Sequence, residues 1–316
     1  MLLEILFIIV GFILLIKGAD YLVEGASNIA KKFHIPEIII GLTVVSIGTS
    51  MPELFVSITS AVDGYSDMAI GNVIGSNVCN LLLILGLSAV IRSIKFQENT
   101  KKIEIPMCFL VSIIFMILCN IGDGISRIDA LFLLVLFVAF ISYTIYIGLK
   151  GQEKETKKEK KEYQKISILK NLFYVVAGIV ALKFGGDFVV DNAVSIAHRF
   201  NLSEKLISLT ILAIGTSLPE LVTSVTAAFK GNSDIAIGNI IGSNIFNMLM
   251  IIGVSALIKP IVYNVSYNLD MVILLFGTML LMLFPKFSKS KNEMHRKNGF
   301  SYLGLYAMYL VILFMI

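Results

Sequence analysis

The chain has 316 residues, of which 57% are apolar and only 15% are charged, and its mean hydropathy is +0.87. Soluble domains carry about 25% charged residues, so this composition excludes a soluble globular protein and predicts an all-α polytopic membrane protein. The formal net charge is +4. The three cysteines, Cys79, Cys108 and Cys119, all lie in apolar runs, which favours neither a disulfide framework nor a zinc site.

Ten apolar segments are long enough to cross a bilayer, which takes about 20 residues of helix. The predicted membrane helices are residues 2–23, 37–61, 68–91, 103–121, 127–149, 168–190, 204–229, 235–258, 268–285 and 300–316. The first is interpreted as a membrane helix rather than a signal peptide, because no small-residue cleavage site follows a short apolar core.

One long polar insert divides the ten predicted helices into five and five. It is Lys150–Lys165, with the sequence KGQEKETKKEKKEYQK. Because this run is highly charged and has no apolar periodicity, we expect a solvated linker. The predicted organisation is a first half at residues 1–150, a charged linker at 151–167 and a second half at 168–316.

One stretch occurs twice, once in each half. The first copy is Gly41–Ile91 and the second is Ser208–Ile258, offset by 167 residues without a gap, and 30 of their 51 positions are identical. Each copy contains the motifs GTS-x-PE and GN-x-IGSN-xx-N. Because five helices per half is an odd number, the second half must enter the membrane from the opposite side. We therefore expect two inverted five-helix repeats, related by a pseudo-two-fold axis in the membrane plane.

Lysine and arginine residues gather on one side of the predicted topology. With the N-terminus outside, 20 of the 26 fall in inside loops and helix ends, 4 fall outside and 2 lie within helices. Cytoplasmic loops of membrane proteins carry the excess of these residues. We therefore expect both termini outside and the lysine-rich linker in the cytoplasm.

The motif GTS-x-PE predicts a break in its helix. Pro52 has no N–H to bond the carbonyl of Gly48, and Gly48 itself weakens the helix. Pro219 and Gly215 repeat the arrangement in the seventh helix. Carbonyls freed at membrane depth are tolerated only where they are buried in protein or line a cavity. We expect helices 2, 3, 7 and 8 to be broken and to form the core.

Two glutamates follow these breaks at matching positions, Glu53 and Glu220. Thr49, Glu53 and Ser57 are spaced four residues apart, so they share one helical face. An ionisable residue inside the membrane is expensive and indicates function. A structural carboxylate bonded to a backbone N–H is the alternative interpretation of each glutamate.

The third and eighth helices each carry a polar face. Its members are Asn72, Ser76 and Asn80 in the third helix and Asn239, Ser243 and Asn247 in the eighth. Ser76, Asn80 and their counterparts are predicted to line an ion site. Asn72 and Asn77, with their counterparts Asn239 and Asn244, are predicted to hold neighbouring helices together.

The candidate metal ligands of these motifs are carboxylates, amides, hydroxyls and freed backbone carbonyls, so the atoms that would bind a cation are all oxygens. Ca²⁺ takes 6–8 oxygen ligands, and Na⁺ uses the same ligand type with less charge, whereas Zn²⁺ or Cu⁺ would favour His or Cys. Two carboxylates match one Ca²⁺ or two Na⁺. A site that either ion can fill, but that is unfavourable when empty and ionised, is a physical basis for exchange.

On these doubled motifs the chain resembles the sodium/calcium exchangers of the cation/calcium exchanger superfamily, particularly the compact prokaryotic type. The resemblance implies a multi-pass protein of a prokaryotic cell membrane in which Glu53 and Glu220 bind Ca²⁺ and Na⁺ competitively. It also implies that helices 1 and 6 slide against the other eight. The further ligand or site-lining positions that it implies are Ser46, Thr49, Ser50, Ser76, Asn80, Ala213, Thr216, Ser217, Ser243 and Asn247.

The predicted function is therefore a secondary antiporter that exchanges Ca²⁺ for Na⁺ by alternating access. Some relatives, including potassium-dependent exchangers, carry Asp at the position of Asn247, so this asparagine argues against K⁺ transport. The alternatives are an H⁺/Ca²⁺ antiporter and, less in keeping with inverted repeats, a cation channel. We expect no enzyme activity, no cofactor, no nucleic-acid partner and no protein partner, with Ca²⁺ and Na⁺ as substrates and the lipid bilayer as the surroundings.

Overall fold

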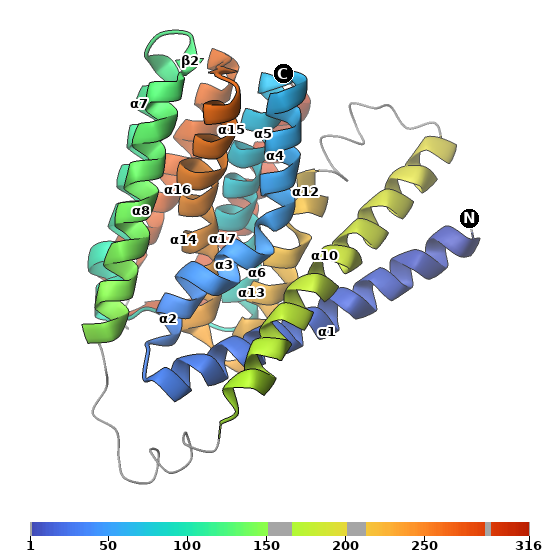
Figure 1. The fold of residues 1–316 in the computed structure, drawn as a ribbon, viewed down its shortest axis with the longest axis vertical. Helices are drawn as coiled ribbons and strands as arrows, with labels where there is room; N and C mark the ends of the chain where they lie inside the picture. The colour runs from blue at the N-terminus through green and yellow to red at the C-terminus, as the bar shows by residue number, and fades with distance from the viewer. Residues whose placement is uncertain (1, 151–165, 201–212, 288–291, 316) are drawn as a thin grey trace.

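A computed structural model describes residues 2–150, 166–200, 213–287 and 292–315. Almost all of the predicted linker 151–167 and the first nine residues of the predicted seventh helix, 204–212, lie outside these ranges. Within them the chain is helical except for short connections and four two-residue strands (Figure 1). The prediction of an all-helical fold is confirmed at this level.

The elements of the first half are α-helices of different lengths, three short π-helical turns (η1–η3) and two short strands. They are α1 Leu2–Phe33, α2 Glu37–Ile40, η1 Gly41–Val45, α3 Ser46–Thr49, α4 Met51–Asp63, α5 Ser66–Val78, η2 Cys79–Ile84, α6 Leu85–Ile91, β1 Ile94–Lys95, η3 Thr100–Glu104, α7 Ile105–Asn120, β2 Gly124–Ile125 and α8 Arg127–Lys150.

The second half follows nearly the same order. Its described elements are α10 Ile168–Arg199, α12 Ala213–Thr216, α13 Leu218–Lys230, α14 Ser233–Phe246, η5 Asn247–Ile251, α15 Ile252–Ile258, β3 Ile261–Val262, η6 Val265–Tyr267, α16 Asn268–Phe287, β4 Glu293–Met294 and α17 Arg296–Met315.

Seven helices of the described chain are long and apolar enough to cross a membrane, or eight if one bent pair counts as a single span. The bent pair is Glu37–Thr49 with Met51–Asp63, and its two parts meet at 49°. Pro52 lies in the first turn of α4, so the break expected after Gly48 is confirmed. Ser217, at the matching position before α13, has nearly the same backbone angles as Ser50 (φ −86° and −84°).

The breaks expected in the third and eighth helices are wrong. Residues Ser66–Ile91 and Ser233–Ile258 each form one continuous span of 26 residues. Neither contains a proline, and each accommodates its polar motif through a π-helical turn, η2 in the first and η5 in the second. A π turn widens the helix locally without ending it, and such turns are common at functional sites.

The first and sixth predicted helices are longer than expected. We predict 2–23 and 168–190 from apolar residues alone, but α1 ends at Phe33 and α10 at Arg199. Asn28, a polar residue of the α1 extension, bonds the other helix, since its Nδ2 donates to Asn171 Oδ1 at 2.9 Å. These two helices pack side by side and slant across the remaining bundle (Figure 1).

The two continuous spans form the centre of the bundle. They are 72% and 83% buried over their most apolar windows, against 22–39% for the other five single-helix spans of the described chain. Every residue of α14 from Ile235 to Phe246 is buried. The core of the protein is therefore the pair of helices that carry the GN-x-IGSN-xx-N motif.

These two central spans run in opposite directions. The Val262 N–H, just beyond the end of α15, donates to Ser66 Oγ at the start of α5 at 3.3 Å. Gln97, shortly after the end of α6, donates to Asp234 at the start of α14 at 2.6 Å. Each span thus begins where the other ends. The short strand that follows each span also pairs with a strand of the other half. β1, after α6, pairs with β4, and β3, after α15, pairs with β2.

Candidate ion-binding site

The two broken helices bring their serines and glutamates together at the centre of the bundle. Ser50 Oγ donates to Glu220 Oε1 at 2.7 Å and lies 3.0 Å from Ser243 Oγ. Ser217 Oγ lies 3.5 Å from Glu53 Oε1. All five side chains are buried. Each carboxylate is therefore contacted by the serine at the break of the other copy, so neither copy forms the site alone.

The local sequence explains how the glutamates are presented. Pro52 and Pro219 occupy the first turns of α4 and α13, where a missing N–H costs no helical hydrogen bond. Glu53 and Glu220 follow within the same turns. Helix N-termini carry partial positive charge and favour carboxylates. In both copies, therefore, the helix break places a glutamate in the first turn of the helix that follows it.

Four buried acceptor oxygens at this centre have no hydrogen-bond partner within the described chain. They are Glu53 Oε2, Glu220 Oε2, Asn80 Oδ1 and Asn247 Oδ1, all on residues with 0% exposure. These oxygens form two pairs at the repeat offset of 167 residues. Buried polar atoms are normally satisfied, and a set of acceptors without donors is what a bound cation would complete.

The orientation of the two amides is fixed by their own nitrogens. Asn80 Nδ2 donates to Asn244 Oδ1 at 3.2 Å, and Asn247 Nδ2 donates to Asn77 Oδ1 at 2.9 Å. Because the NH₂ group of each amide is used in this way, its carbonyl oxygen is the atom left without a partner. The two asparagines are thus held as oxygen donors rather than as nitrogen donors.

Neighbouring asparagines connect the helices, as predicted. Asn77 Nδ2 donates to the carbonyl of Asn244, and Asn244 Nδ2 donates to the carbonyl of Asn77, both at 3.2 Å. Asn72 and Asn239 instead each bond a serine of their own copy at 2.9 Å. The prediction that these four asparagines hold helices together is confirmed by these contacts.

The remaining predicted residues lie around the same centre with different contacts. Ser76 Oγ lies 3.5 Å from Glu53 Oε1. Thr49 Oγ1 donates to Asn239 Oδ1 at 3.1 Å, and the carbonyl of Ser46 lies 3.5 Å from Ser243 Oγ.

On the other copy, Thr216 Oγ1 is buried without a hydrogen-bond partner in the described chain. Ala213 is the first residue of α12. Because an alanine side chain carries no oxygen, Ala213 could contribute only its backbone carbonyl to an ion site. The sequence reasoning does not single out Thr223, whose buried Oγ1 also has no partner there. Its spacing of three residues from Glu220 on α13 would have placed it on the same face.

The donor set is made of oxygen atoms from carboxylates, amides, hydroxyls and backbone carbonyls. No group of three or more His, Cys, Asp and Glu side chains that could hold a metal ion occurs in the described parts of the chain. Two carboxylates with several neutral oxygens suit hard cations of low charge such as Ca²⁺ or Na⁺. The geometry can therefore bind such a cation in contact with both copies of the repeat.

Comparisons with known proteins point in the same direction. Residues 3–146 and 170–315 match the family described as sodium/calcium exchanger protein. The chain is 38% identical to the inner membrane protein YrbG of Escherichia coli over 90% of its length and 89% of that protein's, and 31% identical to the sodium/calcium exchanger MaX1 of Methanosarcina acetivorans over 98% of both chains. A solved structure of the sodium-calcium exchanger NCX_Mj is 33% identical, covers 98% of both chains and superposes with a TM-score of 0.85.

Proposed function

Because the chain belongs to the sodium/calcium exchanger protein family, we propose that it is a secondary antiporter that exchanges Ca²⁺ for Na⁺ across the membrane. The family and its apolar spans make it an integral membrane protein and a cation exchanger. The observation that carries the proposal is the set of four partnerless oxygens on Glu53, Glu220, Asn80 and Asn247.

The charge of the site supports competition between the two ions. Glu53 and Glu220 carry two negative charges when ionised, and neither contacts a Lys or Arg in the described chain. One Ca²⁺ or two Na⁺ would neutralise them, whereas an empty ionised site would leave two charges buried at membrane depth. Translocation of the empty site is therefore disfavoured, and exchange follows from this penalty.

The proposed ligand set combines both copies. Glu53 and Glu220 bind the ions directly, Asn80 and Asn247 contribute amide oxygens, and the break residues contribute hydroxyls and backbone carbonyls. The further proposed members are Ser46, Thr49, Ser50, Ser76, Ala213, Thr216, Ser217 and Ser243.

The amide orientation favours Na⁺ over H⁺ as the driving ion. A proton would need only the carboxylates, whereas Asn80 and Asn247 each donate through their nitrogens and keep a buried carbonyl oxygen that has no hydrogen-bond partner in the described chain. Amide carbonyl oxygens are among the ligands that Ca²⁺ takes in proteins. An H⁺/Ca²⁺ antiporter remains the second candidate, because a buried carboxylate can also carry a proton.

We further propose ten membrane helices arranged as two inverted five-helix repeats, with both termini outside and the lysine-rich linker in the cytoplasm of a prokaryote. The antiparallel central spans support the inversion. The glycine contacts of α1 with α10 support alternating access, since a Cβ on Gly18 would lie 2.9 Å from the carbonyl oxygen of Gly178. Two backbones this close leave no interlocking side chains at that point, which suits a sliding contact.

The test is ⁴⁵Ca²⁺ uptake into proteoliposomes under separately imposed Na⁺, K⁺ and H⁺ gradients. We expect uptake that requires an outward Na⁺ gradient and no uptake with K⁺ alone. Uptake driven by a pH gradient without Na⁺ would establish the H⁺ alternative. Uptake that follows the Ca²⁺ gradient without any counter-ion would indicate a channel and overturn the proposal.

A further inference from the structure

Four buried asparagines form an amide cluster between the two central spans. Asn77 and Asn80 belong to the span of the first half, and their counterparts at the repeat offset, Asn244 and Asn247, belong to that of the second half. All four side chains are 0% exposed. Each of the four hydrogen bonds among them joins one half of the chain to the other. The amide cluster therefore exists only where the two copies meet.

The inner pair of the cluster, Asn77 and Asn244, is oriented by backbone groups. Nδ2 of each side chain donates to the backbone carbonyl of the other residue at 3.2 Å. A backbone carbonyl can only accept a hydrogen bond, so each inner amide must present its NH₂ group there and not its oxygen. The Oδ1 atom of each inner asparagine is thereby left as an acceptor for a further donor.

The outer pair of the cluster takes its orientation from the inner pair. Asn247 Nδ2 donates to Asn77 Oδ1 at 2.9 Å, and Asn80 Nδ2 donates to Asn244 Oδ1 at 3.2 Å. Because the inner Oδ1 atoms can only accept, the outer amides must turn their nitrogens to them. Asn80 Oδ1 and Asn247 Oδ1 are the atoms left buried without a hydrogen-bond partner in the described chain.

We propose that Asn77 and Asn244 are positioning residues of the ion site, which hold Asn247 and Asn80 as oxygen ligands. The inference rests on the proposed function, in which Asn80 and Asn247 bind the ions. An outer amide that turned over would present N–H donors, which repel a cation, where Ca²⁺ takes an oxygen. Loss of an inner asparagine should therefore weaken ion binding although every ligand is still present.

The simpler role for the inner pair is to hold the two spans together, and one substitution separates the two roles. An aspartate at position 247 has two oxygens at the end of its side chain and no nitrogen, so its orientation no longer matters. In the Asn247→Asp background, loss of the Asn77 side chain cannot weaken binding through a turned amide. A loss caused by poorer packing of the spans would persist in that background.

The experiment measures equilibrium ⁴⁵Ca²⁺ binding by the full-length protein in detergent without Na⁺. Asn77→Ala alone should weaken binding by about 10-fold or more, as loss of residues that orient metal ligands commonly does. Added to Asn247→Asp, the same change should weaken binding by no more than about 2-fold, which is the scatter between independent sites. Asn77→Ala keeps the backbone carbonyl that Asn244 bonds, so the other arm of the cluster is retained.

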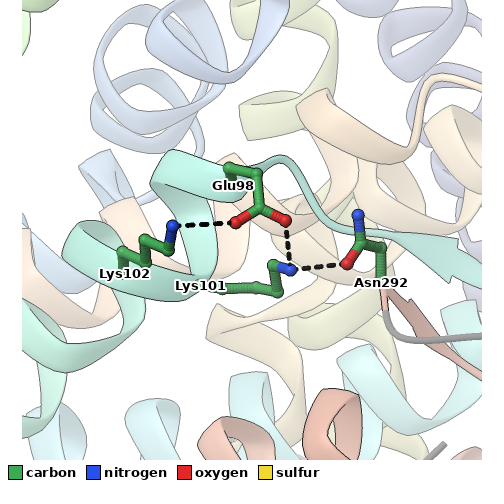
Figure 2. Close-up of polar contacts among 4 residues, drawn as sticks. All are labelled: Glu98, Lys101, Lys102 and Asn292. Atoms are coloured by element: carbon green, nitrogen blue, oxygen red, sulfur yellow. Dashed lines mark hydrogen bonds and ion pairs between the residues drawn. The ribbon is translucent and has the colours of Figure 1, made fainter.

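The control is an asparagine that joins the two halves outside the ion site (Figure 2). Asn292 Oδ1 accepts from Lys101 Nζ at 2.5 Å, and Lys101 also donates to Glu98 at 2.6 Å, all in an exposed position. Asn292→Ala removes a side-chain contact between the halves without touching the amide cluster. It should leave ⁴⁵Ca²⁺ binding unchanged in both backgrounds.

An equal loss of binding in both backgrounds, or no loss in either, would overturn the positioning role. Size-exclusion profiles identify variants that fail to fold. If Asn77→Ala is one of them, Asn244→Ala with and without Asn80→Asp gives the same comparison on the other arm.

Failure of the proposed function has a different signature. Glu220→Gln would then leave ⁴⁵Ca²⁺ binding unchanged, and the positioning role would fall with it. Where Glu220→Gln abolishes binding, equal losses in the two backgrounds overturn the positioning role alone.

Discussion

The two copies of the repeat place the same side chains at the centre of the protein but hold them differently. Ser50 of the first copy donates to Glu220 at 2.7 Å, whereas Ser217 of the second copy is 3.5 Å from Glu53. The backbone at the two breaks is nearly the same. The difference therefore arises from how the helices approach one another and not from local sequence, which is GTS-x-PE in both copies.

This difference is informative about the mechanism. The two copies share one motif, but only one of the two serine–glutamate contacts is short. A second arrangement of the same chain is therefore available, in which the other copy makes the short contact. In an inverted-repeat transporter that change moves the opening from one side of the membrane to the other. On the proposed mechanism, the tight Ser50–Glu220 contact would loosen and the Ser217–Glu53 contact would tighten during transport.

The largest expected effect comes from removing the charge of either glutamate. Glu53→Gln and Glu220→Gln keep the side-chain shape but leave one carboxylate to hold a divalent ion. We expect Na⁺-dependent ⁴⁵Ca²⁺ flux to fall by about 100-fold or more in each, since uncompensated charge inside the bundle costs several kcal/mol. The matched control is Glu98→Gln, at an exposed carboxylate, which should keep its flux. Full flux in either central variant would falsify the assignment of these residues.

A smaller loss is expected where the two halves touch through glycine. A Cβ on Gly18 would meet the carbonyl oxygen of Gly178 at 2.9 Å, and a Cβ on Gly178 would meet that of Gly18 at 2.7 Å. Backbone atoms cannot rotate away as side chains can, so Gly18→Ala and Gly178→Ala should each destabilise the protein by about 1–3 kcal/mol and slow exchange.

Thermal unfolding in detergent and the flux assay together measure this effect. Gly304→Ala on α17 is the control, because a Cβ there meets nothing within 4 Å, and it should stabilise the helix by about 0.5–1 kcal/mol. Nearly equal losses in Gly18→Ala and Gly178→Ala are expected from the matched contacts. A loss confined to one of them would show that the α1–α10 contact does not share the symmetry of the repeat.

Much of the fold could be predicted because the central stretch of the sequence is repeated in each half. The apolar runs indicate the spans, and Pro52 indicates the bend before α4, since a proline inside a helical stretch removes a hydrogen bond and its ring clashes with the carbonyl four residues earlier. The helix ends could not be predicted from apolarity. Residues such as Asn28 continue α1 because they bond another helix, and that partner is known only once the packing is known.

The site was predictable in composition but not in geometry. Residue types and spacing indicate two glutamates among serines and asparagines. Spacing cannot tell which amide atom is left without a hydrogen-bond partner, because this depends on Asn80 donating to Asn244 of the other copy. It also could not anticipate continuous third and eighth spans, since π-helical turns need no proline or glycine to mark them.

The smallest expected effect tests the difference between the two copies at the serines of the helix breaks, Ser50 and Ser217. Ser50→Ala removes a 2.7 Å hydrogen bond to Glu220, and hydrogen bonds to charged groups contribute about 1.5–3 kcal/mol. We therefore expect the KM for Ca²⁺ to change by about 10-fold or more. Ser217→Ala removes a 3.5 Å contact to Glu53 and should change it by no more than about 3-fold. Ser112→Ala is the control, because its buried hydroxyl donates to the carbonyl of Cys108 in its own helix. The measurement is Ca²⁺ dependence of flux in proteoliposomes, and equal effects of the two break serines would mean that the asymmetry between the copies has no part in ion binding.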